Sequence, residues 1–352
     1  MKTSKTFLSA SLLAGLLLAA VGGLAQKQQY MAACVAFYNL ENLFDTIKSP
    51  NTDDSEFLPD GANKWTADKY ALKQRNMASV VRKIGADMLP LGPTILGVAE
   101  IENRLVLEDL TKTPPLNEVD YGIVHYESPD ARGVDVGLLY QKSRFQPLGS
   151  RSARLAIEGM PYFRTRDQLV VSGLLDGELM HIIVMHWPSR RGGEKRSKPL
   201  RDGAAALCRS IVDSLQGADP TAKIIIMGDL NDDPSNESLT KILKARPSIE
   251  ATEKGGLYNT MYKHYQNGVG SLAWDDSWNL FDQIIVSETL LGKDYSTYKL
   301  LKSRVFNEDF LKQKEGRYKG YPFRTYANGA FVGGYSDHFP TYIFLVKNAS
   351  KQ

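Results

Sequence analysis

The strongest constraint on the fold of this chain is a series of short apolar segments, each with polar residues at one end. Continuous apolar runs of this length are typical of strands that are buried on both faces. We expect strands at residues 31–39, 94–99, 134–140, 151–174, 179–185, 223–227, 283–287 and 341–346. Two further segments, residues 66–84 and 200–215, carry apolar residues at helical spacing. Strands with interspersed helices predict sheets that are covered by helices.

The polar residues at the ends of these strands belong to a few chemical types. Asn39, Glu41, Glu100, His186, Asp229 and Asn231 follow predicted strands, and Asp282, Asp337 and His338 precede them. A rigid scaffold presents functional groups at strand ends and in the adjoining loops, so this placement predicts one shared site. The oxygen donors of the set suit Mg²⁺, Mn²⁺ or Ca²⁺ better than zinc. A histidine beside a carboxylate can serve in acid–base catalysis.

A basic stretch follows His186. It holds six cationic residues and one acid, and the cations are Arg190, Arg191, Lys195, Arg196, Lys198 and Arg201. The guanidinium group matches the geometry of phosphate oxygens, so the stretch predicts contacts with phosphate, through Arg190 and Arg191 above all. The alternative is a solvated loop with no ligand.

The N-terminal segment has the pattern of a signal peptide. Two lysines precede an apolar run that ends near residue 25, and a membrane anchor is the alternative. We expect residues 1–25 to be removed and the chain to be exported to the periplasm or secreted, with no membrane insertion afterwards. The absence of a linker or repeat in residues 26–352 predicts one domain. Cys34 and Cys208 fit neither a disulfide framework nor a zinc site, and we expect both to be buried.

Five motifs resemble one family, in the order in which that family has them. They are FYNLENLFD, GVAEIEN, VMHWPSRRGG, MGDLNDDP and GGYSDHFP, which together span residues 37–340. The chain is similar to the endonuclease/exonuclease/phosphatase superfamily, the DNase I-like enzymes, and looks like an exported bacterial member. The resemblance implies a four-layer α/β/β/α sandwich, in which two mainly antiparallel sheets pack together and helices lie outside. It also implies hydrolysis of phosphoesters with a divalent metal ion.

The same resemblance implies a role for each motif residue. Glu100 would be the principal metal ligand with Asn39 beside it, and Glu41 would face a second ion. Asp229 and Asn231 would orient the attacking water and hold the scissile phosphate.

The remaining motif residues would complete the acid–base machinery. His186 would be the general acid, with Asp135 as its acid partner. His338 would contact the phosphate with Asp282 as its partner, and Asp337 would bind the metal or orient the histidine.

The favoured function is an exported, Mg²⁺- or Mn²⁺-dependent phosphodiesterase, acting as a monomer, that hydrolyses DNA or RNA. A phospholipid or small-molecule phosphoesterase is the alternative, and a non-catalytic binding protein is the third hypothesis. We expect no exposed aromatic hairpin of the kind that a lipid-bound enzyme needs. Trp274 and Trp278 are therefore assigned to the core or rim, with base or sugar stacking as the alternative.

Overall fold

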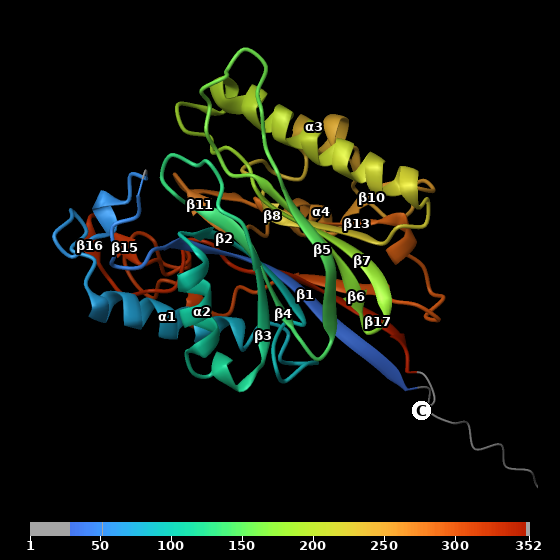
Figure 1. Ribbon diagram of the computed structural model, residues 1–352, viewed down its shortest axis with the longest axis horizontal. Helices are drawn as coiled ribbons and strands as arrows, with labels where there is room; N and C mark the ends of the chain where they lie inside the picture. Colours follow the sequence, from blue (N-terminus) through green and yellow to red (C-terminus); the bar gives the residue numbers. More distant parts are fainter. Residues whose placement is uncertain (1–28, 51, 350–352) are drawn as a thin grey trace, which may run out of the picture.

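Two large β-sheets stack face to face in the computed structural model, which describes residues 29–50 and 52–349 (Figure 1). The predicted signal peptide, residues 1–25, lies outside the described residues. Sheet A has the strand order β14 (Lys299–Val305), β17 (Thr341–Asn348), β1 (Tyr30–Leu43), β2 (Ile95–Ile101), β4 (Asp135–Gln141) and β3 (Tyr121–His125). Sheet B has the order β5 (Phe145–Ala153), β6 (Gln168–Leu175), β7 (Glu178–His186), β8 (Ile224–Asp229), β13 (Asp282–Ser287), β10 (Leu257–Asn259) and β9 (Ala245–Arg246).

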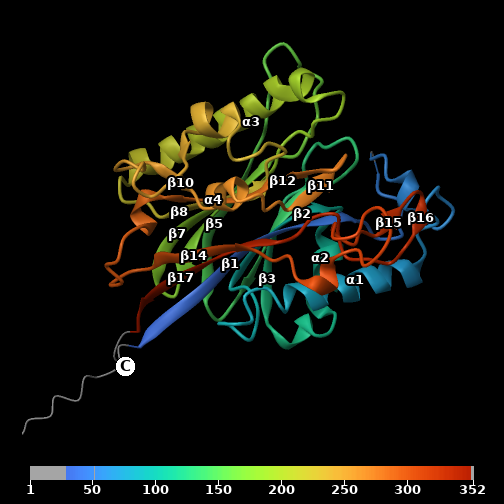
Figure 2. The same ribbon diagram turned by 180° about the vertical axis from the view of Figure 1, so that it is seen from behind.

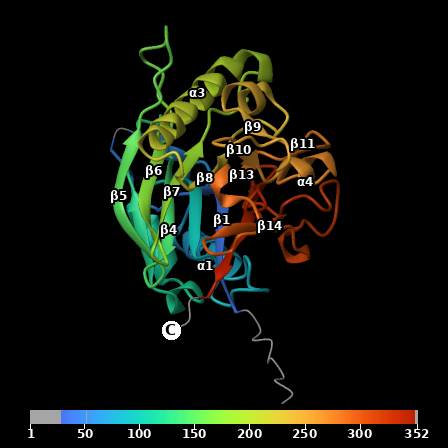
Figure 3. The ribbon, with the colours of Figure 1, turned by 90° about the vertical axis from the view of Figure 1, so that its right-hand side faces the viewer.

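Helices cover the outer face of each sheet. Helices α1 (Ala67–Val81) and α2 (Arg104–Lys112) pack on sheet A, and the long helix α3 (Glu194–Ala218) packs on sheet B (Figure 2). Seen from the side, α3 and α1 lie on opposite sides of the two sheets (Figure 3). Within the large sheets, neighbouring strands are antiparallel except for β1–β2, β7–β8 and β9–β10. This arrangement confirms the predicted four-layer sandwich of two mainly antiparallel sheets.

The continuous apolar runs in the sequence arise because the central strands are buried on both faces. In β1, Val35 and Phe37 face sheet B, whereas Ala36 and Tyr38 face the helices of their own sheet. Cys34, in the same strand, and Cys208, in α3, are both buried and free, as predicted. Each strand therefore contributes to two of the three apolar layers.

Shorter elements gather at one end of the sandwich. Strands β11 (Leu272–Trp274) and β12 (Ser277–Asn279) form one hairpin, and β15 (Tyr326–Ala327) and β16 (Ala330–Phe331) form another. Both hairpins lie at the end of the sandwich opposite the start of β1 (Figure 1). A short helix, α4 (Tyr262–Gln266), lies between β10 and β11 in the sequence. No helix in residues 29–50 or 52–349 is long and apolar enough to span a membrane.

Two predicted elements differ markedly from those in the structure. The segment predicted as strand over 151–174 is interrupted by a loop that contains Gly159 and Pro161, so β5 and β6 form instead. The helix predicted at 200–215 begins six residues earlier, at Glu194, although Pro199 lies inside it. The buried Arg201 side chain explains this early start, because its guanidinium donates to the Glu194 carbonyl at 3.1 Å and to Ser197 Oγ at 2.8 Å.

Candidate active site

Most of the predicted site residues meet where β1, β2, β7 and β8 end and where β13 and β17 begin. Asn39, in β1, donates from Nδ2 to Asp229 Oδ2 at 3.1 Å and so links sheet A to sheet B. Within sheet B, Asp229 lies beside His186 on one side and beside Asp282 on the other. The topology therefore brings residues from all five motifs, together with Asp282, to one end of the sandwich.

Glu100 is aimed into this site by an irregularity in its strand. The register of β2 against β4 shifts between Ala99 and Ile101, and Glu100 has a φ of +58°, a left-handed conformation that is strained for glutamate. One carboxylate oxygen accepts from the Asn42 N–H at 3.0 Å. The other lies 3.9 Å from His186 Nε2 and 3.7 Å from the Arg132 guanidinium. This second oxygen is available to a ligand.

His338 and Asp282 form the acid–histidine pair that the sequence predicts. His338 Nδ1 and Asp282 Oδ2 are 2.6 Å apart, and Asp282 is fully buried. Ser271 Oγ donates to the same carboxylate oxygen. Burial lowers the pKa of His338, but Asp282, Asp229 and Asp337 together outweigh burial and raise it well above its usual value. The pair holds the ring with Nε2 toward Asp229 Oδ2, at 3.9 Å.

The SDHFP motif is anchored to the first motif of the chain. Ser336 Oγ donates to the Asn39 carbonyl at 2.7 Å and accepts from the His338 N–H at 3.1 Å. The loop before β17 therefore holds His338 against β1 and the rest of the site.

Asp229 and Asn231 are organised by backbone hydrogen bonds. The Asn231 N–H donates to Asp229 Oδ1 at 3.0 Å, and its side-chain Nδ2 donates to the Trp187 carbonyl at 2.9 Å. Asn231 has a φ of +49°, which its short polar side chain tolerates. Burial, above all, and the charge of Asp282 raise the pKa of Asp229 to about 7. The Asp229 carboxylate is therefore buried and lies beside a second carboxylate, that of Asp282.

The structure does not pair His186 with Asp135, so that prediction is wrong. Asp135 Oδ2 lies 3.0 Å from Nε2 of His125, in the neighbouring strand of sheet A. His186, in sheet B, has its Nε2 3.5 Å from Asp229 Oδ2, and its buried Nδ1 has no hydrogen-bond partner among the described residues. Burial, then the charges of Arg166 and Arg132, hold the pKa of His186 well below its usual value. A neutral ring of this kind does not match the general acid that the sequence predicts.

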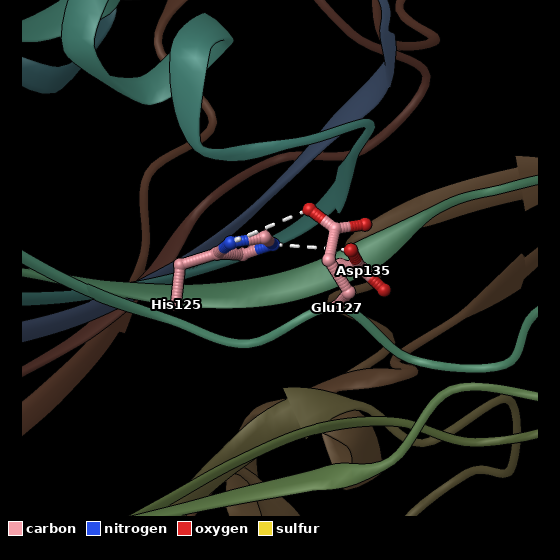
Figure 4. Close-up of side chains that lie close together, drawn as sticks. All are labelled: His125, Glu127 and Asp135. Carbon is pink, nitrogen blue, oxygen red and sulfur yellow. Dashed lines mark hydrogen bonds and ion pairs between the residues drawn. The ribbon is translucent and has the colours of Figure 1, made fainter. Parts of the chain in front are cut away.

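Asp135 instead belongs to a small cluster with His125 and Glu127 on sheet A, where it pairs with Ile101 at the end of β2 (Figure 4). Its Oδ1 accepts from the Ser128 N–H at 2.9 Å, and Glu127 Oε1 lies 3.9 Å from His125 Nδ1. Among the described residues, only His125, Glu127 and Asp135 bring three histidine, cysteine or carboxylate ligand atoms within 4.8 Å of one another. The hydrogen bonds of Asp135 fix the loop that follows β3.

Glu41 and Asp337 are engaged by cationic side chains. The Glu41 carboxylate accepts from the Thr325 N–H at 2.7 Å and lies 3.2 Å from Arg324 and 3.7 Å from the buried Lys73 ammonium. Arg324 also reaches Asp337 at 2.9 Å. Burial, then the charge of Asp337, raises the pKa of Glu41. Glu41 and Asp337 therefore both form ion pairs within the protein. Glu100 is better placed than either of them to bind a metal ion.

The donor set around Glu100 fits a hard divalent cation. Glu100 and Asp229 present carboxylate oxygens 3.9 Å and 3.5 Å from the same atom, His186 Nε2, and the Asn39 side chain contacts Asp229. Magnesium needs only one or two carboxylates, because water and substrate oxygens fill its other positions. Burial, above all, raises the pKa of Asp229, and a bound cation would favour its charged form.

The two arginines predicted to contact phosphate differ in the structure. Arg190 donates from Nε to the Asn231 carbonyl at 2.9 Å and lies 3.2 Å from Asp232 and 3.3 Å from Glu194. Its cationic group is therefore engaged within the protein. Arg191 is exposed, and its guanidinium has no partner among the described residues. Arg191 alone of this pair is free to meet a phosphate.

Sequence reasoning missed residues that join the site from outside the motifs. Arg132 lies beside Glu100, and Ser271 supports Asp282. Near Arg132, the only sequence feature that indicated a turn beside the site was Gly133, which has a φ of +74°. The expectation of no exposed aromatic hairpin is also wrong, because the β11–β12 hairpin carries Trp274, 73% exposed, and Trp278, 39% exposed.

A four-layer sandwich with carboxylates and two histidines at one end defines the class of DNase I-like phosphoester hydrolases. The sequence profile described as "Endonuclease/Exonuclease/phosphatase family" matches residues 34–347, and the chain belongs to this family. Members are hydrolytic phosphoesterases that generally use divalent metal ions.

Solved structures share the fold at low sequence identity. A Bacteroides thetaiotaomicron protein of the same family is 16% identical, with a TM-score of 0.55, over 92% of this chain and 100% of that one. A mannosyl-6-phosphatase from the same organism is 17% identical, with a TM-score of 0.53, over 89% and 99%. D. rerio TDP2, solved with a single-strand DNA product, is 15% identical, with a TM-score of 0.54, over 89% and 98%. No curated protein sequence matches the chain.

Proposed function

We propose that this protein is a divalent-metal-dependent phosphoesterase that cleaves a phosphoester by attack of water. The observation that carries the proposal is the meeting of the His338–Asp282 pair, Asp229 and Glu100 at one end of the sandwich. Mg²⁺ or Mn²⁺ held by Glu100 and Asn39 would neutralise phosphate charge and polarise the phosphoester.

The residues divide the remaining tasks by position. Asp282 occupies Nδ1 of His338, so Nε2 is the ring nitrogen left to contact a phosphate oxygen. Asp229, held by Asn231 and Asn39, would orient the attacking water and accept its proton. The neutral His186 would contact substrate as an uncharged donor or acceptor.

Nucleic acid is one candidate substrate. Three exposed cations, Arg191, Lys195 and Arg196, follow β7 near the site, and they would attract a phosphate backbone. The similarity to TDP2, solved with a DNA product, adds support for this nuclease function.

A compact phosphoester is the second candidate, and the charge beside the site favours it. Arg190 is occupied within the protein, and carboxylates line the cavity next to Asp337. The carboxylates of the cavity would repel the further phosphates of an extended polyanion. A small phosphoester would place only its uncharged alcohol portion in the cavity. The similarity to a mannosyl-6-phosphatase agrees with this alternative.

Hydrolysis assays on residues 26–352 test the proposal. The substrates are bis(p-nitrophenyl) phosphate, p-nitrophenyl phosphate and supercoiled plasmid, with Mg²⁺, Mn²⁺, Ca²⁺ or EDTA, and His338→Ala as the control. We expect hydrolysis that requires both metal and His338. Hydrolysis that His338→Ala leaves intact would contradict the assignment of the site. No hydrolysis of any substrate by a folded, metal-loaded protein would favour a binding protein.

We also propose that the chain acts outside the cytoplasm after loss of residues 1–25. The basic and apolar pattern of that segment supports this proposal. Fractionation of cells that express the full chain, followed by N-terminal sequencing, tests it.

A further inference from the structure

A large cavity adjoins the candidate active site. Its volume is about 740 Å³, and it lies between the β11–β12 hairpin and residues 313–328. Asp337 and Arg324 line it, and Asp337 Oδ1 is 3.9 Å from His338 Nε2. A substrate whose phosphate meets His338 can therefore extend its alcohol portion into this cavity.

The hairpin that walls the cavity is fastened to the His338–Asp282 pair. Ser271, directly before β11, donates from Oγ to Asp282, and its carbonyl accepts from the Phe339 N–H at 2.7 Å. The Trp278 ring also stacks on Phe339, with 6.0 Å between ring centroids. These contacts set the position of the cavity relative to the catalytic histidine.

Aromatic rings form one part of the cavity lining. Trp274, 73% exposed, and Tyr318, 41% exposed, present ring surface, and Tyr321 lies beside Tyr318 with 5.7 Å between centroids. An exposed indole at the edge of a cavity offers a flat apolar face to a ring of similar size. Such a face binds the carbon skeleton of a ligand and not its phosphate.

Hydrogen-bond acceptors form the other part. Asp275 and Glu315 have carboxylates with no hydrogen-bond or ion-pair partner among the described residues. Asp276 accepts from the Tyr321 hydroxyl at 2.9 Å and lies 3.8 Å from Arg317. Together with Asp337, the lining has four carboxylates against two arginines. The cavity therefore repels a second phosphate and favours a neutral group that donates hydrogen bonds.

We propose that this cavity binds the alcohol portion of the substrate and that this portion is a neutral, hydroxyl-rich ring, as in a sugar or cyclitol phosphate. The C–H face of such a ring would stack on Trp274, and its hydroxyls would donate to the free carboxylates of Asp275 and Glu315. This inference rests on the proposed phosphoesterase function and names its substrate class.

Paired substrates and variants test the inference. Phosphate release is measured from a hexose 6-phosphate, an inositol monophosphate, ethyl phosphate, thymidine 5′-monophosphate and phosphocholine. The methyl diesters of each form a second set, for which release of methyl phosphate and the free alcohol is measured. The variants are Trp274→Ala, Asp275→Asn and the matched control Tyr162→Ala, which removes a 94% exposed aromatic outside the cavity.

We expect the wild type to prefer a hydroxyl-rich ring over ethyl phosphate by about tenfold or more in kcat/KM. Trp274→Ala and Asp275→Asn should remove that preference and leave ethyl phosphate turnover unchanged, whereas Tyr162→Ala should change neither. Equal rates for ethyl and ring phosphates would overturn the inference while leaving the proposed function intact. A Trp274-dependent preference for thymidine monophosphate or phosphocholine over the sugar would overturn it as well.

A protein without any turnover would contradict the proposed function but still allow the cavity to be tested. Calorimetric titration with the hexose 6-phosphate would then decide. Binding that Trp274→Ala abolishes supports the subsite, and no binding to the folded protein overturns it.

Discussion

Replacing Asp282 by asparagine should slow catalysis strongly without unfolding the protein. The asparagine amide has nearly the same shape, so its oxygen can still accept from His338 Nδ1, at the 2.6 Å separation seen here. What is lost is the negative charge that supports a charged imidazole. A hydrogen bond to a charged group contributes roughly 1.5–3 kcal/mol. The neutral hydrogen bond that remains contributes roughly 0.5–1.5 kcal/mol, so about 1–1.5 kcal/mol is lost. Because each 1.36 kcal/mol corresponds to tenfold in rate, kcat should fall by about 5- to 13-fold.

The matched control for this variant is Ser271→Ala. It removes a second hydrogen bond to the same Asp282 oxygen but keeps the carboxylate charge. We expect kcat to fall less than in Asp282→Asn. Steady-state kinetics at saturating metal measure both variants, and circular dichroism confirms that each is folded. A kcat for Asp282→Asn within threefold of the wild type would contradict the role assigned to the Asp282 charge. An equal loss of kcat in Ser271→Ala would contradict it as well.

Three further predictions follow from single contacts. Glu100→Gln should raise the metal concentration for half-maximal activity by about tenfold or more, since a ligating charge is lost; a metal titration showing no shift would contradict this. Arg190→Ala should lower Tm by about 3 °C, because it loses roughly 2 kcal/mol of charged hydrogen bonds. Arg191→Ala should keep Tm and reduce the salt slope of nucleic-acid binding by about 1. Equal Tm losses would argue against the different roles of the two arginines. Burial raises the pKa of Glu102 to about 7 from 4.5, so the folded state holds more protons and the free energy of unfolding should fall as pH rises through this window. Urea denaturation at pH 5 and pH 8 should show that Glu102→Gln weakens the pH dependence of the free energy of unfolding. If the variant leaves that pH dependence unchanged, other titrating groups cause it.

Much of the fold and part of the site could be predicted from the sequence. Apolar strands buried on both faces leave a direct pattern, so nearly every central strand was found, with its polar end residues. The convergence of Asn39, Asp229, Asp282 and His338 was predicted because their strands end or begin at a shared edge. The predicted start of α3, at residue 200, was wrong. Pro199 and the glycines at 192 and 193 disfavour a helix, but the hydrogen bonds of the buried Arg201 extend α3 back to Glu194.

The family, the sheet-forming segments and the oxygen-rich chemistry of the site can be identified from the amino-acid sequence. Which side chains become partners depends on how the two sheets fold together. Asp135 bonds to His125 because β3 and β4 are neighbours in sheet A, while His186 lies in sheet B. Likewise, Arg190 donates a hydrogen bond to the Asn231 carbonyl and forms an ion pair with Asp232, whereas Arg191 is exposed. The sequence does not distinguish these two adjacent arginines. Periodicity shows which face of a strand is buried, but neighbours and register depend on how all the strands pack together.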